Sequence, residues 1–277
     1  MRIALTIAGS DPSGGAGIQA DLKTFAAFGL YGASAITAIT AQSTKGIEAT
    51  LALPADLVTA QIEAVAGDLT IHATKVGMLA NAAIVEAVAA AIAGMDLPLV
   101  VVDPVLISSS GERLLDEDGV RALCAELLPR ARVVTPNIPE AEALSGRRIG
   151  SLKEARDAAR RIHDLGAAAV IITGGHGRWD DDGGSGLRAQ GSQSHVVDLL
   201  FDGRAFHEFR VPRVESRHTH GTGCTFASAV AAGLALGRDV PDAAARAQQY
   251  VAGGIAHAPG IGHGRGPLDH FWERRSG

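Results

Sequence analysis

The segment Arg2-Ile-Ala-Leu-Thr-Ile-Ala8-Gly-Ser-Asp-Pro-Ser-Gly-Gly-Ala-Gly17 reveals the architecture, because an apolar strand pattern passes through a glycine loop directly into a helix pattern. Short β-branched runs of this kind alternate with alanine-rich stretches of helical length as far as Thr173. The alternation predicts βαβ units around a mostly parallel sheet, and hence an α/β fold. We expect strands at Arg2 to Ala8, Ala33 to Thr40, Thr74 to Met78, Leu99 to Asp103, Arg132 to Thr135 and Ala169 to Thr173, and helices at Gly15 to Phe28, Ala55 to Ala66, Ala80 to Ala93, Glu117 to Leu128 and Ser151 to Leu165.

A polar run interrupts this alternation after Thr173. The residues from Gly174 to His195 are rich in Gly, Asp, Ser and Gln, and offer too little apolar surface to order themselves. We therefore expect a flexible surface loop at 177–195. The helix before the run opens with Ser151-Leu-Lys-Glu154, a capping-box pattern that fixes its boundary.

The last third of the chain returns to regular patterns. Val196 to Phe201 and Ala205 to Val211 flank Asp202-Gly203, which predicts an antiparallel hairpin at the sheet edge. Two helices rich in small residues are expected at Gly223 to Leu236 and Asp242 to His257. No linker or internal repeat divides the sequence, so residues 1–277 are predicted to form one domain.

Composition and charge exclude several classes of function. The chain has 277 residues, 47% of them hydrophobic, with a formal charge of −5 and a pI near 6.0. Without a basic excess, a nucleic acid is not an expected partner. The two cysteines, Cys124 and Cys224, form no CxxC and fit a reducing compartment. A polar loop follows only seven residues of the amino terminus, too few for a signal peptide or membrane span, so we expect a cytoplasmic protein without membrane contact.

Ligands of parallel sheets bind in the loops at the carboxyl ends of the strands. The first such loop, Gly9 to Gly17, allows the backbone to approach a ligand, but a purely structural turn explains it equally well. It is not a Walker A loop, because Gly15-Ala16 stands where Lys-Ser/Thr is required. By itself this loop is weak evidence for phosphate binding.

Acidic residues follow the fourth and fifth predicted strands. Asp103 is placed where a carboxylate can hold a magnesium-phosphate, with a capping or turn role as the alternative. Farther on, Asn137 and Glu140 lie on either side of a helix start, followed by Glu142. Capping explains Asn137 equally well, but not the repeated acids. Glu140 and Glu142 are therefore expected, with Asp103, to hold Mg²⁺, partly through water.

The strongest local feature is Arg217-His-Thr-His-Gly-Thr-Gly-Cys-Thr-Phe226, a glycine turn that leads into a long helix of small residues. Its unpaired amides lie at the positive end of the helix dipole and predict an anion site. Amides of this kind stabilise a transferring phosphoryl group by ~3 to 4 kcal/mol each. The nearby histidines His220, His257 and His263 match no zinc spacing.

At this point the motifs resemble a known family. Gly221-Thr-Gly-Cys224 lies where ribokinase-like enzymes carry Gly-Ala-Gly-Asp, and Asn137-x-x-Glu140 resembles their second signature. The chain is similar, more narrowly, to the hydroxymethylpyrimidine/phosphomethylpyrimidine kinases. The matching stretches occur in the same order along nearly the whole chain: Thr6 to Lys23, Ala38 to Thr44, Lys75 to Leu79, Asp103 to Val105, Thr135 to Glu142, Thr219 to Thr225 and His257 to Gly264.

This resemblance implies a ribokinase-like three-layer α/β/α sandwich that forms a homodimer and uses ATP and Mg²⁺. Its implied reaction phosphorylates 4-amino-5-hydroxymethyl-2-methylpyrimidine and then the resulting monophosphate, in thiamine biosynthesis. By the same analogy Gln42 hydrogen-bonds the ring, surrounded by Gly9, Asp11, Met78 and Val105. Catalysis falls to Cys224, Gly221 and Gly223, and nucleotide binding to Asn137, Thr173 and Thr222.

Two positions depart from the related patterns. Cys224 replaces the catalytic Asp of the wider group, and a helix amino terminus can lower a thiol pKa, so Cys224 is either a base or only a close neighbour of the hydroxymethyl group. Thr173 occupies the place of a Lys carried by many members, and a hydroxyl there can still contact ATP.

Two other functions remain open from the sequence. A pyridoxal or pyridoxine kinase shares the fold and phosphorylates a similar hydroxymethyl group, but Cys224 and the stretch around Gln42 argue against it. A non-catalytic nucleotide sensor is the second alternative. The presence of Asp103, Asn137 and Glu140 argues against that alternative.

Overall fold

The computed structural model describes residues 1–107, 111–175 and 195–275. Within them runs a nine-stranded sheet in the order β3-β2-β1-β4-β5-β6-β7-β8-β9, parallel from β2 to β7. Both edges are antiparallel, because β3 pairs with β2, and β8 pairs with β7 and β9. The strands are β1 (Ile3–Ser10), β2 (Tyr31–Ser43), β3 (Gly46–Ala52), β4 (Ala73–Val76), β5 (Val100–Val102), β6 (Val133–Val134), β7 (Val170–Ile172), β8 (His195–Phe201) and β9 (Phe206–Pro212).

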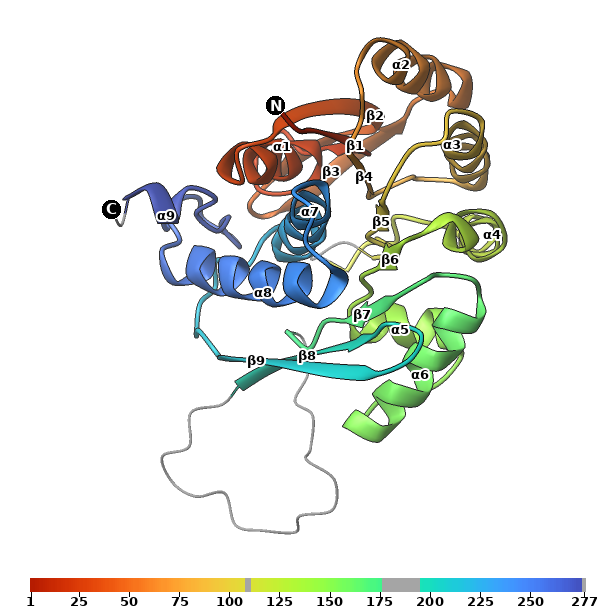
Figure 1. Ribbon diagram of the computed structural model, residues 1–277. Coiled ribbons are helices and arrows are strands. Elements are labelled where there is room, and N and C mark those ends of the chain that lie inside the picture. Colours follow the sequence, from red (N-terminus) through yellow and green to blue (C-terminus); the bar gives the residue numbers. More distant parts are fainter. Residues whose placement is uncertain (108–110, 176–194, 276–277) are drawn as a thin grey trace, which may run out of the picture.

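Helices cover both faces of the sheet, which gives three layers (Figure 1). One face packs against α1 (Gly17–Ala27), α7 (Thr222–Ala235) and α8 (Val240–Ala256). The other packs against the remaining long helices. These are α2 (Ala55–Asp68), α3 (Ala82–Gly94), α4 (Glu117–Ala122) with its continuations η1 (Leu123–Leu127) and η2 (Leu128–Arg130), α5 (Ile138–Ser145) and α6 (Leu152–Asp164); a short α9 (Trp272–Arg275) follows α8.

The sequence patterns explain these elements. β5 is an unbroken run of three buried valines, as expected of a strand covered on both faces. In α6 the buried residues recur every three or four positions, from Leu152 to Ile162, so only one stripe of this helix faces the core. In α7 every residue from Thr225 to Ala235 is buried, and its small side chains allow the helix to lie close to the sheet.

The predicted α/β architecture and the hairpin are confirmed, with local corrections. β3 was not predicted, because most of its side chains are exposed and leave no core pattern. The helix expected at Glu117 to Leu128 changes to π geometry after Ala122 and then to a 3-10 turn that contains Pro129 and ends at Arg130. Of the loop expected at 177–195, His195 begins β8, and the rest lies outside the described residues.

The parallel strands bring several predicted site residues to one edge of the sheet. β1, β4, β5, β6 and β7 run in the same direction, so the segments that follow them share that edge. The residues that follow these strands are Asp11, Met78, Asp103, Asn137 and Thr173.

No helix in the described part of the chain is long and apolar enough to cross a bilayer.

Candidate active site

The glycine turn at the start of α7 packs directly on the loop after β1. Gly221 has φ +79°, a left-handed conformation that favours glycine, and a side chain there would strike the carbonyl of Gly15. The helix begins at Thr222, so its first amides lack partners within the helix. The predicted anion turn is therefore held against the amino-terminal loop, with its amides at the end of the helix dipole.

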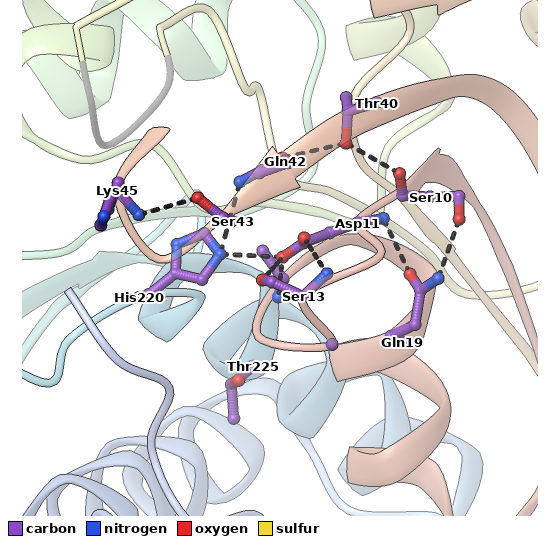
Figure 2. Close-up of polar contacts among 12 residues, drawn as sticks. Ser10, Asp11, Ser13, Gln19, Thr40, Gln42, Ser43, Lys45, His220 and Thr225 are labelled. Atoms are coloured by element: carbon purple, nitrogen blue, oxygen red, sulfur yellow. Dashed lines mark hydrogen bonds and ion pairs between the residues drawn. The ribbon is translucent and has the colours of Figure 1, made fainter. Parts of the chain in front are cut away.

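Asp11 organises the loop after β1 (Figure 2). Its carboxylate accepts the Ser13 N–H, the Ser13 hydroxyl and the Ala16 N–H at 2.8 to 2.9 Å, and lies 2.8 Å from His220 Nε2. Burial raises the pKa of Asp11, but the hydrogen bonds from His220 and Ser13 outweigh it and hold the pKa below the usual value. The carboxylate expected at the substrate ring is thus fully engaged in holding the loop and His220.

Gln42, near the end of β2, joins the same group of residues. Its side-chain amide lies 3.4 Å from His220 Nε2 and 3.0 Å from the Thr40 hydroxyl. Gly9 and Met78 also meet, since a Cβ added at Gly9 would lie 3.0 Å from the Met78 sulfur. Four of the five residues predicted to surround the ring therefore lie in two neighbouring groups. Asp11 and Gln42 both contact His220, and Gly9 lies against Met78.

Val105, the fifth, lies with a different group. It follows β5, which is two strands away from β1, and its N–H donates to the carbonyl of Asp103 at 2.8 Å. It is half-buried. Val105 therefore lies on the side of the site that carries the acidic residues.

Asp103 and Glu140 form a buried acidic pair. Each is 5% exposed, and the Oδ2 atom of Asp103 has no hydrogen bond among the described residues. Burial raises the pKa of Asp103 to about 6, although Lys75 opposes the rise. Burial, followed by the charge of Asp103, raises the pKa of Glu140 to about 8. A Cβ added at Gly223 would lie 3.9 Å from Asp103 Oδ2, so the anion turn faces this pair.

The donor set of this pair fits magnesium. Mg²⁺ takes oxygen ligands and often only one or two carboxylates, with water completing its shell. The unpaired Oδ2 of Asp103 and the mutual repulsion of the two acids are features that a cation would relieve. Asp103 and Glu140 are therefore suitable residues to hold Mg²⁺ beside the anion turn.

Glu142 does not join the pair. Its Oε1 accepts the Ile149 N–H at 2.8 Å, and its Oε2 lies 3.6 Å from the Arg148 guanidinium. Two positions along a helix turn a side chain through about 200°, so Glu140 and Glu142 face opposite ways on α5. The expectation that Glu142 contributes to the metal site is not supported by this placement.

A buried ion pair next to Asp103 was not predicted from the sequence. Lys75 and Asp21 are both 0% exposed, with Lys75 Nζ 3.0 Å from Asp21 and 4.0 Å from Asp103 Oδ2. Burial alone would lower the Lys75 pKa, but the surrounding negative groups, led by Asp21, raise it above its usual value. A lysine in the middle of the short strand β4 was the signal that could have revealed this pair.

Asn137 and Thr173 lie side by side at the ends of β6 and β7. They form an isolated parallel bridge, and the Thr173 N–H donates to the carbonyl of Pro136 at 2.9 Å. Asn137 also caps α5 in a complete capping box with Glu140. The capping role considered from the sequence is thus confirmed for Asn137, and it fixes the position of Glu140.

Next to Thr173, the buried Asp198 of β8 braces the chain. It accepts the Gly174 N–H at 2.8 Å and the Gln248 side-chain amide at 2.9 Å. Burial raises the pKa of Asp198 to about 6, although both bonds oppose the rise. A single carboxylate therefore ties the segment after β7 to α8.

The Cys224 thiol is not activated by its surroundings. Burial raises its pKa to about 12, and the negative charges of Asp103 and Asp21 add to the rise, while Lys75 opposes it. A helix amino terminus can lower a thiol pKa, but the carboxylates beside Cys224, which the sequence could not place there, oppose that effect. Cys224 is held as a neutral thiol next to Asp103.

Comparisons with known proteins point to one family. The family model described as phosphomethylpyrimidine kinase matches residues 11–269. The hydroxymethylpyrimidine/phosphomethylpyrimidine kinase of Streptomyces coelicolor is 45% identical over 98% of this chain and 94% of its own length. The thiamine biosynthesis bifunctional protein ThiED of Geobacter sulfurreducens is 47% identical over 96% of this chain, which spans 52% of that longer protein. An ADP complex of Bacillus subtilis pyridoxal kinase superposes with a TM-score of 0.85 at 35% identity, covering 99% of each chain.

Proposed function

The chain belongs to the phosphomethylpyrimidine kinase family, and from that membership we propose that it phosphorylates 4-amino-5-hydroxymethyl-2-methylpyrimidine with ATP, then phosphorylates the monophosphate, in thiamine biosynthesis. It is a kinase, and thus a transferase. The reaction forms a bond between the substrate oxygen and the γ-phosphorus and breaks the bond to ADP. The substrate hydroxyl loses its proton in the same reaction.

One observation carries this proposal: the amides of the glycine turn and the acidic pair face the same space. Gly223 lies over Asp103, while His220, immediately before the turn, contacts Gln42. Amides at a helix start stabilise the charge that develops on a transferring phosphoryl group. A ring held by Gln42 then has its hydroxymethyl group within reach of that phosphoryl group.

Nucleotide and metal are assigned to neighbouring residues. We place the ATP phosphates near Asn137, Thr173 and Thr222, an assignment supported by the bridge between Asn137 and Thr173. Asp103 and Glu140 would hold Mg²⁺, which neutralises phosphate charge when bound. The buried Lys75 stays positive and limits the repulsion between Asp103 and the incoming phosphates.

Cys224 acts here as a neighbour of the hydroxymethyl group and not as a base. A thiol with a pKa near 12 is almost entirely protonated at neutral pH, and loose phosphoryl-transfer transition states need little base. We expect Cys224→Ala to lower turnover by about tenfold through loss of positioning, with ATP binding unchanged. Steady-state kinetics with both substrates measure this, and Cys224→Ser is the matched control. A loss of several thousand-fold would restore the base assignment.

The substrate is tested against pyridoxal. An assay coupled to ADP release, with mass spectrometry of the products, compares the aminopyrimidine, its monophosphate and pyridoxal. We expect the pyrimidine to give both a mono- and a diphosphate, at a kcat/KM well above that for pyridoxal. A preference for pyridoxal would favour the function of the structurally similar pyridoxal kinase, and no ADP release with any of them would favour a nucleotide sensor.

The assembly proposed is a cytoplasmic homodimer of one kinase domain per chain. The exposed edge strand β3 supports an interface, since Leu51 on it and Ile39 on β2 are 65% and 47% exposed and lie opposite each other in the ladder. Light scattering coupled to gel filtration tests the dimer. A Leu51→Lys variant is expected to shift the mass toward that of one chain.

A further inference from the structure

The side-chain amide of Gln42 lies between two hydrogen-bonding groups that determine which way round it faces (Figure 2). In the structure Gln42 Nε2 lies 3.4 Å from His220 Nε2, and Gln42 Oε1 lies 3.0 Å from the Thr40 hydroxyl. The oxygen and the NH₂ of an amide have nearly the same shape, so the neighbouring donors and acceptors decide which atom occupies each end.

The end of the Gln42 amide that faces His220 should be a hydrogen-bond acceptor. Nε2 of His220 lies 2.8 Å from Oδ2 of Asp11, whose oxygens also receive three donors from Ser13 and Ala16. A carboxylate that accepts this many bonds is ionised and offers only lone pairs. His220 Nε2 must therefore carry a hydrogen. The end of Gln42 that faces this N–H is favourable only when it is the carbonyl oxygen.

The end of the Gln42 amide that faces the Thr40 hydroxyl should be a hydrogen-bond donor. The Thr40 hydroxyl, on a residue that is 5% exposed, lies 3.0 Å from the Ser10 carbonyl and 3.0 Å from the Gln42 amide. A hydroxyl has one hydrogen, and a carbonyl can only accept it. With that hydrogen donated to Ser10, the lone pairs of Thr40 face Gln42, which must present its NH₂. Both sides therefore favour the oxygen toward His220 and the NH₂ toward Thr40, which is the reverse of the amide orientation drawn in Figure 2.

We infer that His220 and Thr40 are positioning residues that fix the direction of the Gln42 amide and thereby select a ring with an amine beside a ring nitrogen. The inference rests on the proposed function. The two contacts leave one lone pair on the oxygen and one hydrogen on the NH₂ for a ligand. A ring amine donates to the oxygen on the His220 side, and a ring nitrogen accepts from the NH₂ on the Thr40 side.

The position of the anion turn supports the same direction independently. In the aminopyrimidine, the amine is attached between the ring nitrogen and the carbon that carries the hydroxymethyl group. That hydroxymethyl group must reach the turn from Gly221 to Cys224, which begins immediately after His220. The amine then lies nearer to His220 than the ring nitrogen does. Ring and amide therefore match without further rearrangement.

A substrate pair with opposite hydrogen-bonding patterns tests this inference. The 4-oxo analogue of the pyrimidine carries a carbonyl and a ring N–H in place of the amine and the bare ring nitrogen. In the wild-type protein we expect kcat/KM to be far higher for the amine. In Thr40→Val only the 3.4 Å contact with His220 still orients the amide, so the ratio of the two kcat/KM values falls by about tenfold, the effect of one misplaced hydrogen bond.

Thr40→Ser is the matched control, because it keeps the hydroxyl and should keep the wild-type ratio. An equal loss for both substrates in Thr40→Val, with the ratio unchanged, would mean that Thr40 only supports the fold and would overturn the inference alone. Failure of the wild-type protein to phosphorylate either pyrimidine would overturn the proposed function, and this inference with it.

A second measurement does not depend on any variant. In a crystal structure of the wild-type protein with the aminopyrimidine bound, the methyl and hydroxymethyl groups reveal the orientation of the ring. We expect the amine to meet Gln42 on the side of His220. A ring bound with its nitrogen on that side and its amine toward Thr40 would overturn the inference.

Discussion

Asp11 and Asp103 are both buried carboxylates at the same edge of the sheet, after β1 and β5, yet their surroundings are opposite. Asp11 accepts hydrogen bonds from Ser13 and Ala16 and contacts His220, and its pKa lies below the usual value. Asp103 leaves Oδ2 without a hydrogen bond, and burial raises its pKa to about 6.

The difference separates two kinds of buried charge. A carboxylate that accepts hydrogen bonds on both oxygens is part of the framework and holds other residues in place. One that is buried with an oxygen left without a hydrogen bond raises the free energy of the folded protein and is a candidate for binding a ligand that supplies the missing partner. Asp11 is of the first kind and Asp103 of the second.

Among the variants that test the difference between Asp11 and Asp103, the largest effect is expected on the kcat of Asp103→Asn. Loss of the carboxylate should lower kcat by roughly 10²- to 10³-fold, as removal of one strong electrostatic group does. The melting temperature should change little, because the variant loses the 4.0 Å ion pair with Lys75 but also removes the cost of burying this carboxylate. The ADP-coupled assay and thermal unfolding measure the two quantities. A stable variant with wild-type kcat would show that Asp103 is not needed by the reaction.

Asp11→Asn should behave in the opposite way. An amide cannot accept from all the donors around Asp11, so the free energy of unfolding should fall by about 2 to 3 kcal/mol. Urea unfolding measures this loss next to Asp103→Asn, which serves as the matched Asp-to-Asn control. If both variants unfolded at the same urea concentration, the difference in hydrogen bonding would have no energetic consequence.

Asp198 is intermediate between Asp11 and Asp103, because it is buried but accepts only two hydrogen bonds from protein groups that the structure describes, and its effect on stability should depend on pH. Its folded pKa of about 6 lies above the ~3.9 of an unfolded chain, so the folded state prefers the protonated form. Its contribution to stability is complete below pH ~4 and is lost as the pH rises to about 6. We expect Asp198→Asn to remove about 2 kcal/mol of the change in the free energy of unfolding between pH 4 and pH 7. Urea unfolding at pH 4 and pH 7 measures this change. If the free energy of unfolding changed between the two pH values as much in the variant as in the wild-type protein, the prediction would be contradicted.

The smallest effect is expected in Glu142→Gln. The side chain bonds the Ile149 N–H away from the acidic pair, so kcat should stay within about twofold and stability should fall by about 1 kcal/mol. Glu140→Gln, on the same helix but beside Asp103, is the matched control and should lower kcat strongly. A loss of magnesium dependence in Glu142→Gln would return Glu142 to the metal site.

Much of the molecule was predictable because the relevant physics is local. The apolar period of α6, the valines of β5 and the turn at Asp202-Gly203 all reveal themselves within a few residues. The glycine turn was predictable for the same reason, since its conformation and the helix it starts are adjacent in sequence. The edge strand β3 was missed because an exposed strand lacks the burial pattern that marks the others.

Sequence alone predicted most of the strands and helices in their order, the glycine turn before α7 and the likeness to a kinase family, since each depends on neighbouring residues or on motifs in a fixed order. Only the tertiary structure decided which acids are satisfied and which are not. His220 meets Asp11 from 209 positions away, Lys75 meets Asp21 from 54, and Gln42 meets His220 from 178. Burial and hydrogen bonding set the charge state of a side chain, and both come from residues that folding brings together.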